Sequence, residues 1–251
     1  MQDINIKDRI SKIKDRISKY YASQSVNRLE DFLTQKCWFD IIDKRNSETA
    51  HSSFIAWLLN SNESHQLGIK PCFLFLNMLR CRILTDEQKK SMPQDLENAI
   101  LTKKIHIEKV ETTTEKSTTN GRVDILTTLS LSENIQIEDS SYKYIRLVIE
   151  NKIGTKEHDK QTQKYHEYFN NNPNEGLTGG NIFYVYIFLT ADSTAYLDML
   201  TETECNDKTY IQTNYQDIYD LILTPILSTT LSEKTRNCLE EYVKCLSISK
   251  Y

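Results

Sequence analysis

The sequence lacks the patterns of a structural metal or of a disulfide framework. Its 6 cysteines include no Cys-x-x-Cys pair and no zinc-ligand spacing, and its 5 histidines form no metal-binding pattern. We therefore interpret the cysteines as reduced thiols, in the core or at the surface of a cytoplasmic protein. The cysteine pattern therefore favours reduced thiols over a disulfide-stabilised secreted domain.

The chain also lacks membrane signals and an excess of basic residues. No apolar run approaches the length of a membrane span, and the charged, periodic N-terminus is unlike a signal peptide. We therefore expect no membrane partner. With 31 Lys and Arg against 35 Asp and Glu, the net charge is −4. This balance argues against broad, unspecific coating of duplexes, but it leaves room for a local nucleic-acid site.

The pattern of apolar residues predicts an α/β fold with a mixed central β-sheet flanked by helices, like the core of restriction endonucleases. Helical periodicity covers roughly the first 100 residues; three strands, a helix, two strands and closing helices follow. We expect one domain over residues 1–251, with a helical N-terminal region (1–100) and a core (101–251). A semi-independent N-terminal cap is the alternative.

Individual elements are predicted from apolar runs, caps and turn residues. Asn46 or Ser47 should cap a mostly buried helix, and Asn120-Gly121 should form a turn. Pro225 is expected to interrupt a helix near its end. The predicted strands span residues 105–114, 123–126, 144–153, 181–190 and 210–213, and the main predicted helices 48–59, 71–84, 156–169, 216–227 and 232–246.

Three charged residues stand out because they lie in apolar strands. Glu150 and Lys152 alternate with apolar residues, so they share one face of their strand, and Asp124 lies in the preceding strand. Buried charges are costly unless they are paired or bind metal. Mg²⁺ (or Mn²⁺) fits two carboxylates, and the backbone carbonyl of Asn151 could add a third oxygen. The alternative is an ion pair between Glu150 and Lys152 at the end of the strand, with Asp124 as a turn residue.

The charged segment that follows is predicted to be a helix from about Lys156 to Phe169. Gln161 and Tyr165 are four residues apart and therefore share a face. Lys156, Lys160 and Lys164 repeat the same step on a neighbouring stripe. That stripe could contact a phosphate backbone, although a solvated helix face is the plainer interpretation.

Taken in order, Asp124, Glu150-Asn151-Lys152 and Gln161-x-x-x-Tyr165 resemble the motifs of the PD-(D/E)xK nuclease superfamily. The Gln-x-x-x-Tyr element is similar to that of its RecB-like and lambda-exonuclease-like branches. Val123 stands where the family name has proline. The resemblance implies Mg²⁺-dependent cleavage of nucleic acid, with DNA favoured, and catalytic roles for Asp124, Glu150, Lys152, Gln161 and Tyr165.

An earlier helix carries the block E-x-x-H-S-x-F-x-A-W-L-L, from Glu48 to Leu59. It resembles one bacterial branch of PD-(D/E)xK-like proteins of uncertain role. In the superfamily a helix before the sheet often supplies another acidic metal ligand, so the resemblance makes Glu48 a third metal-ligand candidate beside Asp124 and Glu150. The alternative is an acidic residue favoured by the helix dipole. His51 is interpreted as structural.

The N-terminus contains the tandem sequence IKDRISK-IKDRISK, in which Ile6, Ile10, Ile13 and Ile17 follow heptad spacing. Two heptads favour an amphipathic helix packed on its own domain. The alternative is a helix through which the chain forms a homo-oligomer or binds a partner.

The favoured function is a metal-dependent nuclease. Two other readings stay open: a catalytically inactive nucleic-acid-binding protein on the same fold, and a partner-interaction protein organised by the heptad helix.

Overall fold

The computed structural model describes residues 12–19, 36–153, 157–191 and 205–247. Within them, five strands form one sheet in the order β1-β2-β3-β4-β5. β1, β2 and β3 pair antiparallel, whereas β3, β4 and β5 pair parallel. The predicted mixed sheet is therefore confirmed. The strands are β1 (Ile107–Thr118), β2 (Gly121–Ile137), β3 (Ser140–Lys152), β4 (Ile182–Thr190) and β5 (Ile211–Asn214).

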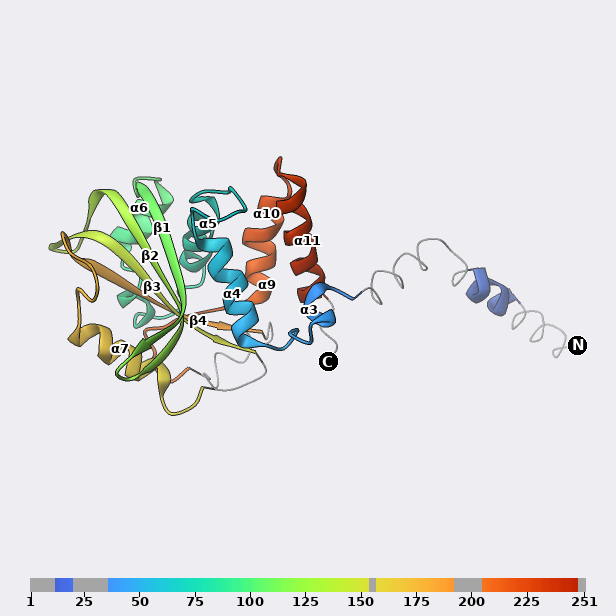
Figure 1. The fold of residues 1–251 in the computed structure, drawn as a ribbon, viewed down its shortest axis with the longest axis horizontal. Helices are drawn as coiled ribbons and strands as arrows, with labels where there is room; N and C mark the ends of the chain where they lie inside the picture. The colour runs from blue at the N-terminus through green and yellow to red at the C-terminus, as the bar shows by residue number, and fades with distance from the viewer. Residues whose placement is uncertain (1–11, 20–35, 154–156, 192–204, 248–251) are drawn as a thin grey trace, which may run out of the picture.

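Helices cover both faces of this sheet, with α7 on one side and the other labelled helices on the opposite side (Figure 1). The arrangement confirms the predicted restriction-endonuclease-like α/β class. The helices are α3 (Trp38–Ile41), α4 (Glu48–Leu59), α5 (Lys70–Arg80), η1 (Gln88–Lys90), α6 (Gln94–Leu101), α7 (Gln161–Asn171), α9 (Tyr215–Ile218), the π-helical turn η2 (Tyr219–Leu223), α10 (Thr224–Leu227) and α11 (Glu233–Ser247).

Local sequence signals explain where several elements begin. Ser47 caps α4, because its Oγ accepts a hydrogen bond from the Ala50 N–H at 3.3 Å. Pro71 lies in the first turn of α5, where a missing N–H costs nothing. Gly121 begins β2 with a φ of +138°, a value that suits glycine, directly after the β1–β2 turn.

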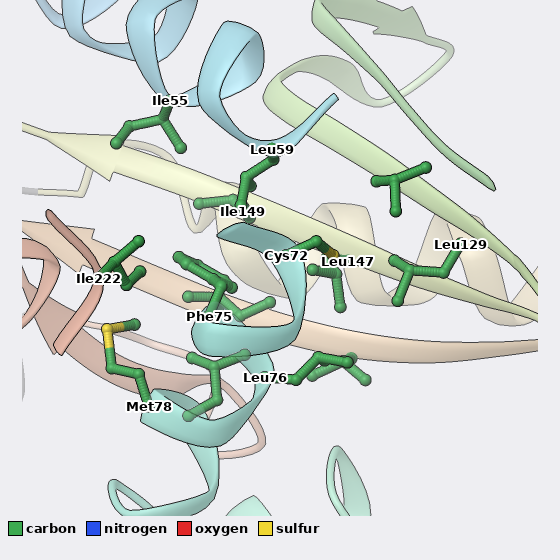
Figure 2. Close-up of a cluster of buried hydrophobic side chains, with 14 of the residues drawn as sticks. Ile55, Leu59, Cys72, Phe75, Leu76, Met78, Leu129, Leu147, Ile149 and Ile222 are labelled. Carbon is green, nitrogen blue, oxygen red and sulfur yellow. The ribbon is translucent and has the colours of Figure 1, made fainter. Parts of the chain in front are cut away.

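The larger hydrophobic cluster lies between the sheet and helices α4, α5, α6, η2 and α11. Figure 2 shows Ile55 and Leu59 of α4 and Phe75 of α5 packed over Leu147 and Ile149 of β3. A smaller cluster on the opposite sheet face joins Val148 and Phe188 to Tyr165 and Phe169 of α7. Residues before and after position 100 therefore share one core.

None of the helices within the described residues is long and apolar enough to cross a membrane.

The prediction of one helix from about Lys156 is wrong. Lys160 adopts a left-handed conformation (φ 55°, ψ 44°), and α7 begins at Gln161. The side chain of Glu157 explains this start, because its Oε1 accepts hydrogen bonds from the N–H and hydroxyl of Thr162 at 2.9 and 2.8 Å. Lys160 and Lys164 therefore do not form a stripe on one helix, and Lys156 lies outside the described residues.

Two further differences concern the length of β1 and the pitch of the closing helix. β1 extends to Thr118, beyond the predicted end at 114, because its polar Thr-rich half pairs with β2 as far as Gly121. Before Pro225 the closing helix contains the π-helical turn η2. The sequence could not predict either feature. The second half of β1 is polar and so shows no apolar alternation, and a π-helical turn has no apolar pattern of its own.

The N-terminal heptad is only partly described. Residues 12–19 are helical, and Ile13 and Ile17 are 56% and 50% exposed. The predicted packing of this helix on its own domain is therefore not found for these two residues. Ile6 and Ile10 lie outside the described residues.

Candidate active site

Three charged side chains lie on the α7 face of the sheet, where β2 begins and β3 ends. Alternation along β3 places Glu150 and Lys152 on the face of Val148, which packs in the cluster with α7. The pairing of Ile125 with Ile149 puts Asp124 opposite Glu150 at the next step of the antiparallel ladder. The structure thus brings the first three predicted site residues together.

Glu150 is 1% exposed, yet its carboxylate is poorly satisfied. The Lys152 ammonium lies 2.7 Å from Oε1, whereas Oε2 has no hydrogen-bond partner within the described part of the chain. Burial, followed by the repulsion of Asp124, raises the pKa of Glu150 to about 8. A buried carboxylate with an unsatisfied oxygen is what a bound cation would stabilise.

Asp124 and Lys152 complete this charged group. Asp124 Oδ2 accepts a hydrogen bond from the Asn151 N–H at 2.8 Å. Burial raises the pKa of Asp124 to about 6, although that hydrogen bond and the Lys152 charge oppose the rise. For Lys152, burial favours the neutral amine, but Glu150 and Asp124 outweigh it and raise its pKa above the ordinary value. Lys152 is therefore a cation at neutral pH.

The side chain of Asn151 points to the other sheet face and fixes the end of β3. Its amide donates to the Glu48 carbonyl oxygen at 3.2 Å and to the Ser52 hydroxyl at 3.0 Å. The Tyr215 hydroxyl donates to its Oδ1 at 2.8 Å. Helices α4 and α9 therefore hold the strand that carries Glu150 and Lys152.

Glu48 lies at the same end of β3. Its Oε1 accepts a hydrogen bond from the Ile153 N–H at 3.0 Å, and its charge contributes to the raised pKa values of Asp124 and Lys152. Among the described residues, however, no three His, Cys, Asp or Glu side chains gather into a metal-binding group. Asp124 and Glu150 are therefore the two carboxylates that remain as candidate metal ligands.

Gln161 and Tyr165 approach this site from α7. The Tyr165 hydroxyl donates to the Arg122 carbonyl oxygen at 2.8 Å, two residues before Asp124. Gln161 Nε2 lies 3.5 Å from the same hydroxyl. Burial, followed by the Glu150 charge, raises the pKa of Tyr165 to about 12. A Cβ on Gly121 would lie 3.1 Å from the Tyr165 ring, so glycine permits this contact.

Of the remaining predicted residues that the structure describes, two are exposed and one is structural. Lys160 and Lys164 are exposed, and the backbone carbonyl of Lys164 accepts a hydrogen bond from Asn120. His51 is buried, and its ring nitrogens contact the Tyr242 hydroxyl at 2.8 Å and the Arg45 carbonyl at 2.7 Å. Burial lowers its pKa, which agrees with the structural interpretation.

The fold is therefore a mixed α/β sheet in which the β2–β3 hairpin brings two acids and a lysine together. A sequence model of the PD-(D/E)XK nuclease superfamily matches residues 38–244, and the chain belongs to this superfamily. Neither the curated proteins nor the solved structures yielded a match. The assignment to the RecB-like branch stays a prediction.

Sequence reasoning missed three residues that hold or extend the site. Tyr215 comes from a region with no motif, and only the fold brings it to Asn151. Ser52 lies one turn after Glu48, a spacing that was visible, but the sequence could not show that it meets Asn151. Arg146 lies four residues before Glu150, so alternation along the strand places it on the same face.

Proposed function

We propose that this protein is a nuclease that uses a divalent cation, Mg²⁺ or Mn²⁺, to hydrolyse phosphodiester bonds in DNA. The observation that carries the proposal is the buried, half-satisfied carboxylate of Glu150, which lies opposite Asp124 and beside the Lys152 ammonium. Membership of the nuclease superfamily supports the same reaction class.

The residues fit a hard cation. Asp124 and Glu150 would hold it, with the backbone carbonyl of Asn151 as an oxygen donor and Glu48 as an additional acidic group at the edge. When bound, the cation would polarise the scissile phosphate and lower the pKa of a bound water. It would also relieve the desolvation that raises the pKa values of both carboxyl groups.

Each protein group then has a defined part. Lys152 lies 2.7 Å from Glu150 and is positively charged, so it would orient the attacking water or offset negative charge on the phosphate in the transition state. Tyr165 is a positioning residue, because it binds the carbonyl of Arg122 and so fixes the strand that carries Asp124. Gln161 supports the Tyr165 hydroxyl.

The test is cleavage of single- and double-stranded DNA by purified protein in Mg²⁺, in Mn²⁺ and in EDTA. We expect cleavage only with a cation, loss of cleavage in Glu150→Gln, and unchanged cleavage in Lys104→Gln, which removes an exposed charge outside the site. Metal-independent cleavage, or equal activity in Glu150→Gln, would reject the assignment.

A DNA-binding protein that does not cut is the second candidate. It is favoured by the absence of a three-acid group among the described residues. DNA binding without cleavage, together with Mn²⁺ binding that Asp124→Ala leaves unchanged in titration calorimetry, would establish this alternative.

A further inference from the structure

A second charged feature lies on the catalytic face of the sheet. An open pocket of about 490 Å³ is lined by residues of β1, β2 and β3 and by the loop after α7. Small-molecule pockets typically measure about 300–1,000 Å³, so this volume suits a nucleotide-sized group. The lining includes Thr114, Lys116, Thr128, Arg146, Glu115 and Glu175.

Arg146 is the unusual residue of this pocket. Its exposed fraction is 5%, and burying an arginine is costly unless its charge is compensated. Its Nε donates to the Thr128 hydroxyl at 3.2 Å, and its Nη1 donates to the Glu175 carbonyl oxygen at 2.9 Å. Its Cζ lies 5.9 Å from the centre of the Tyr184 ring. Among the described residues no carboxylate forms an ion pair with it.

Both carboxylates that line the pocket pair with cations other than Arg146. Glu115 pairs with Arg122, and Glu175 Oε1 lies 3.5 Å from the Lys116 ammonium. Glu175 Oε2 is buried without a hydrogen-bond partner in the described part of the chain. The pocket therefore offers an anion, such as the phosphate of a nucleotide, a guanidinium that has no carboxylate partner among the described residues.

The location of the pocket relates it to the active site. Arg146, Val148, Glu150 and Lys152 alternate along one face of β3, and at about 3.3 Å per residue Arg146 lies about 13 Å along the strand from Glu150. At about 3.4 Å per nucleotide in a duplex strand, this distance spans about four nucleotides or fewer. A strand cleaved at Glu150 can thus reach Arg146.

We propose that this pocket is a subsite for a nucleotide of the substrate strand flanking the cleaved bond, with Arg146 binding its phosphate. The inference rests on the proposed nuclease function. Its physical basis is that a delocalised guanidinium, held by two hydrogen bonds to neutral oxygens, is pre-organised for phosphate.

Binding to single-stranded oligodeoxynucleotides in EDTA, followed by fluorescence anisotropy, tests the subsite without cleavage. In wild-type protein, a series of oligonucleotides is compared in which one phosphate at a time is replaced by a neutral methylphosphonate. Because cleavage does not fix the register in EDTA, each oligonucleotide is only about four nucleotides long, the length that spans Glu150 to Arg146, so that a strand spanning both residues has one register. We expect a loss of affinity of about tenfold or more at one position only.

Arg146→Gln and Lys104→Gln are then measured with the same series. Arg146→Gln should weaken binding of the all-phosphate strand about tenfold and should remove the effect of the critical methylphosphonate, whereas Lys104→Gln should do neither. Near-equal losses at every position in wild-type protein would overturn the subsite, even if Arg146→Gln is unstable. If free deoxynucleoside monophosphate displaced the oligonucleotide at the same concentration of nucleotide, the pocket would be a site for a small ligand. That result would also overturn the subsite.

The two proposals can fail separately. Position-specific binding without any metal-dependent cleavage would remove the nuclease function and leave a DNA-binding site. Cleavage without a position-specific contact would keep the nuclease and reduce Arg146 to a residue that supports the loop after α7.

Discussion

The two faces of strand β3 are buried to a similar extent but differ in polarity. On the face toward α4 and α5, Leu147 and Ile149 are completely buried among other apolar side chains. On the face toward α7, Arg146, Glu150 and Lys152 are almost as buried but carry charge. Burying charged groups costs stability that apolar groups would not cost, which is what we expect if the α7 face carries the proposed nuclease site.

The largest expected effect lies on the charged face. Lys152→Ala should lower the DNA cleavage rate by about 10²–10⁴-fold, because it removes the cation that offsets transition-state charge. Circular dichroism should still show a folded protein. If Lys152→Ala cleaved DNA at the wild-type rate, the charged face of β3 would not carry the proposed nuclease site.

On the opposite face, Ile149→Ala should lower the free energy of unfolding by about 2–5 kcal/mol, because it leaves a cavity beneath α4 and α5. Urea denaturation measures this change. If Ile149→Ala abolished cleavage while the stability stayed unchanged, the division of roles between the faces would be wrong.

Metal affinity should depend on pH in a defined direction. Below pH 6 both Asp124 and Glu150 hold protons, since their pKa values are about 6 and 8, and a cation must displace them. Between pH 6 and 8 only Glu150 must lose its proton, so the Mn²⁺ dissociation constant should fall about tenfold per pH unit. Calorimetry at pH 6, 7 and 8 checks this, and a constant affinity would exclude Glu150 as a ligand.

The same pKa shifts predict the stability of the metal-free protein. The folded pKa of Glu150 lies above its unfolded value, so the folded state holds more protons between about pH 4.5 and 8, and this contribution to stability declines as pH rises through that window. Saturating Mg²⁺ should therefore raise the melting temperature more at pH 8.5 than at pH 5. An equal rise at both pH values would contradict it.

The smallest expected effect concerns Tyr165. Tyr165→Phe keeps the ring beside Gly121 but removes the hydrogen bond to the Arg122 carbonyl. We expect a loss of about 0.5–1.5 kcal/mol in unfolding free energy and a few-fold lower cleavage rate at unchanged metal affinity. A loss as large as that of Lys152→Ala would make Tyr165 a catalytic residue.

The sequence predicted the sheet, its charged strand and the main helices because their apolar periods are strong. Glu150 and Lys152 could be placed on one face because strand alternation is strict. Asp124 could be added only as a second acid in an apolar strand and through the motif order, since its position opposite Glu150 depends on the pairing of β2 with β3. The start of α7 could not be predicted, since it depends on the Glu157 side chain and on left-handed Lys160. Tyr215 was missed because its contact with Asn151 joins residues 64 positions apart.

The hydrogen bond from Ile153 N–H to Glu48 has a practical consequence for protein engineering. Polypeptides 36–101 and 102–247 each carry half of the interface that fastens the end of β3, so neither half alone should cut DNA. Mixing them should restore cleavage, which would make the pair a split reporter of proximity. Failure of the mixture to cut, with both fragments soluble, would show that the chain must be continuous for assembly.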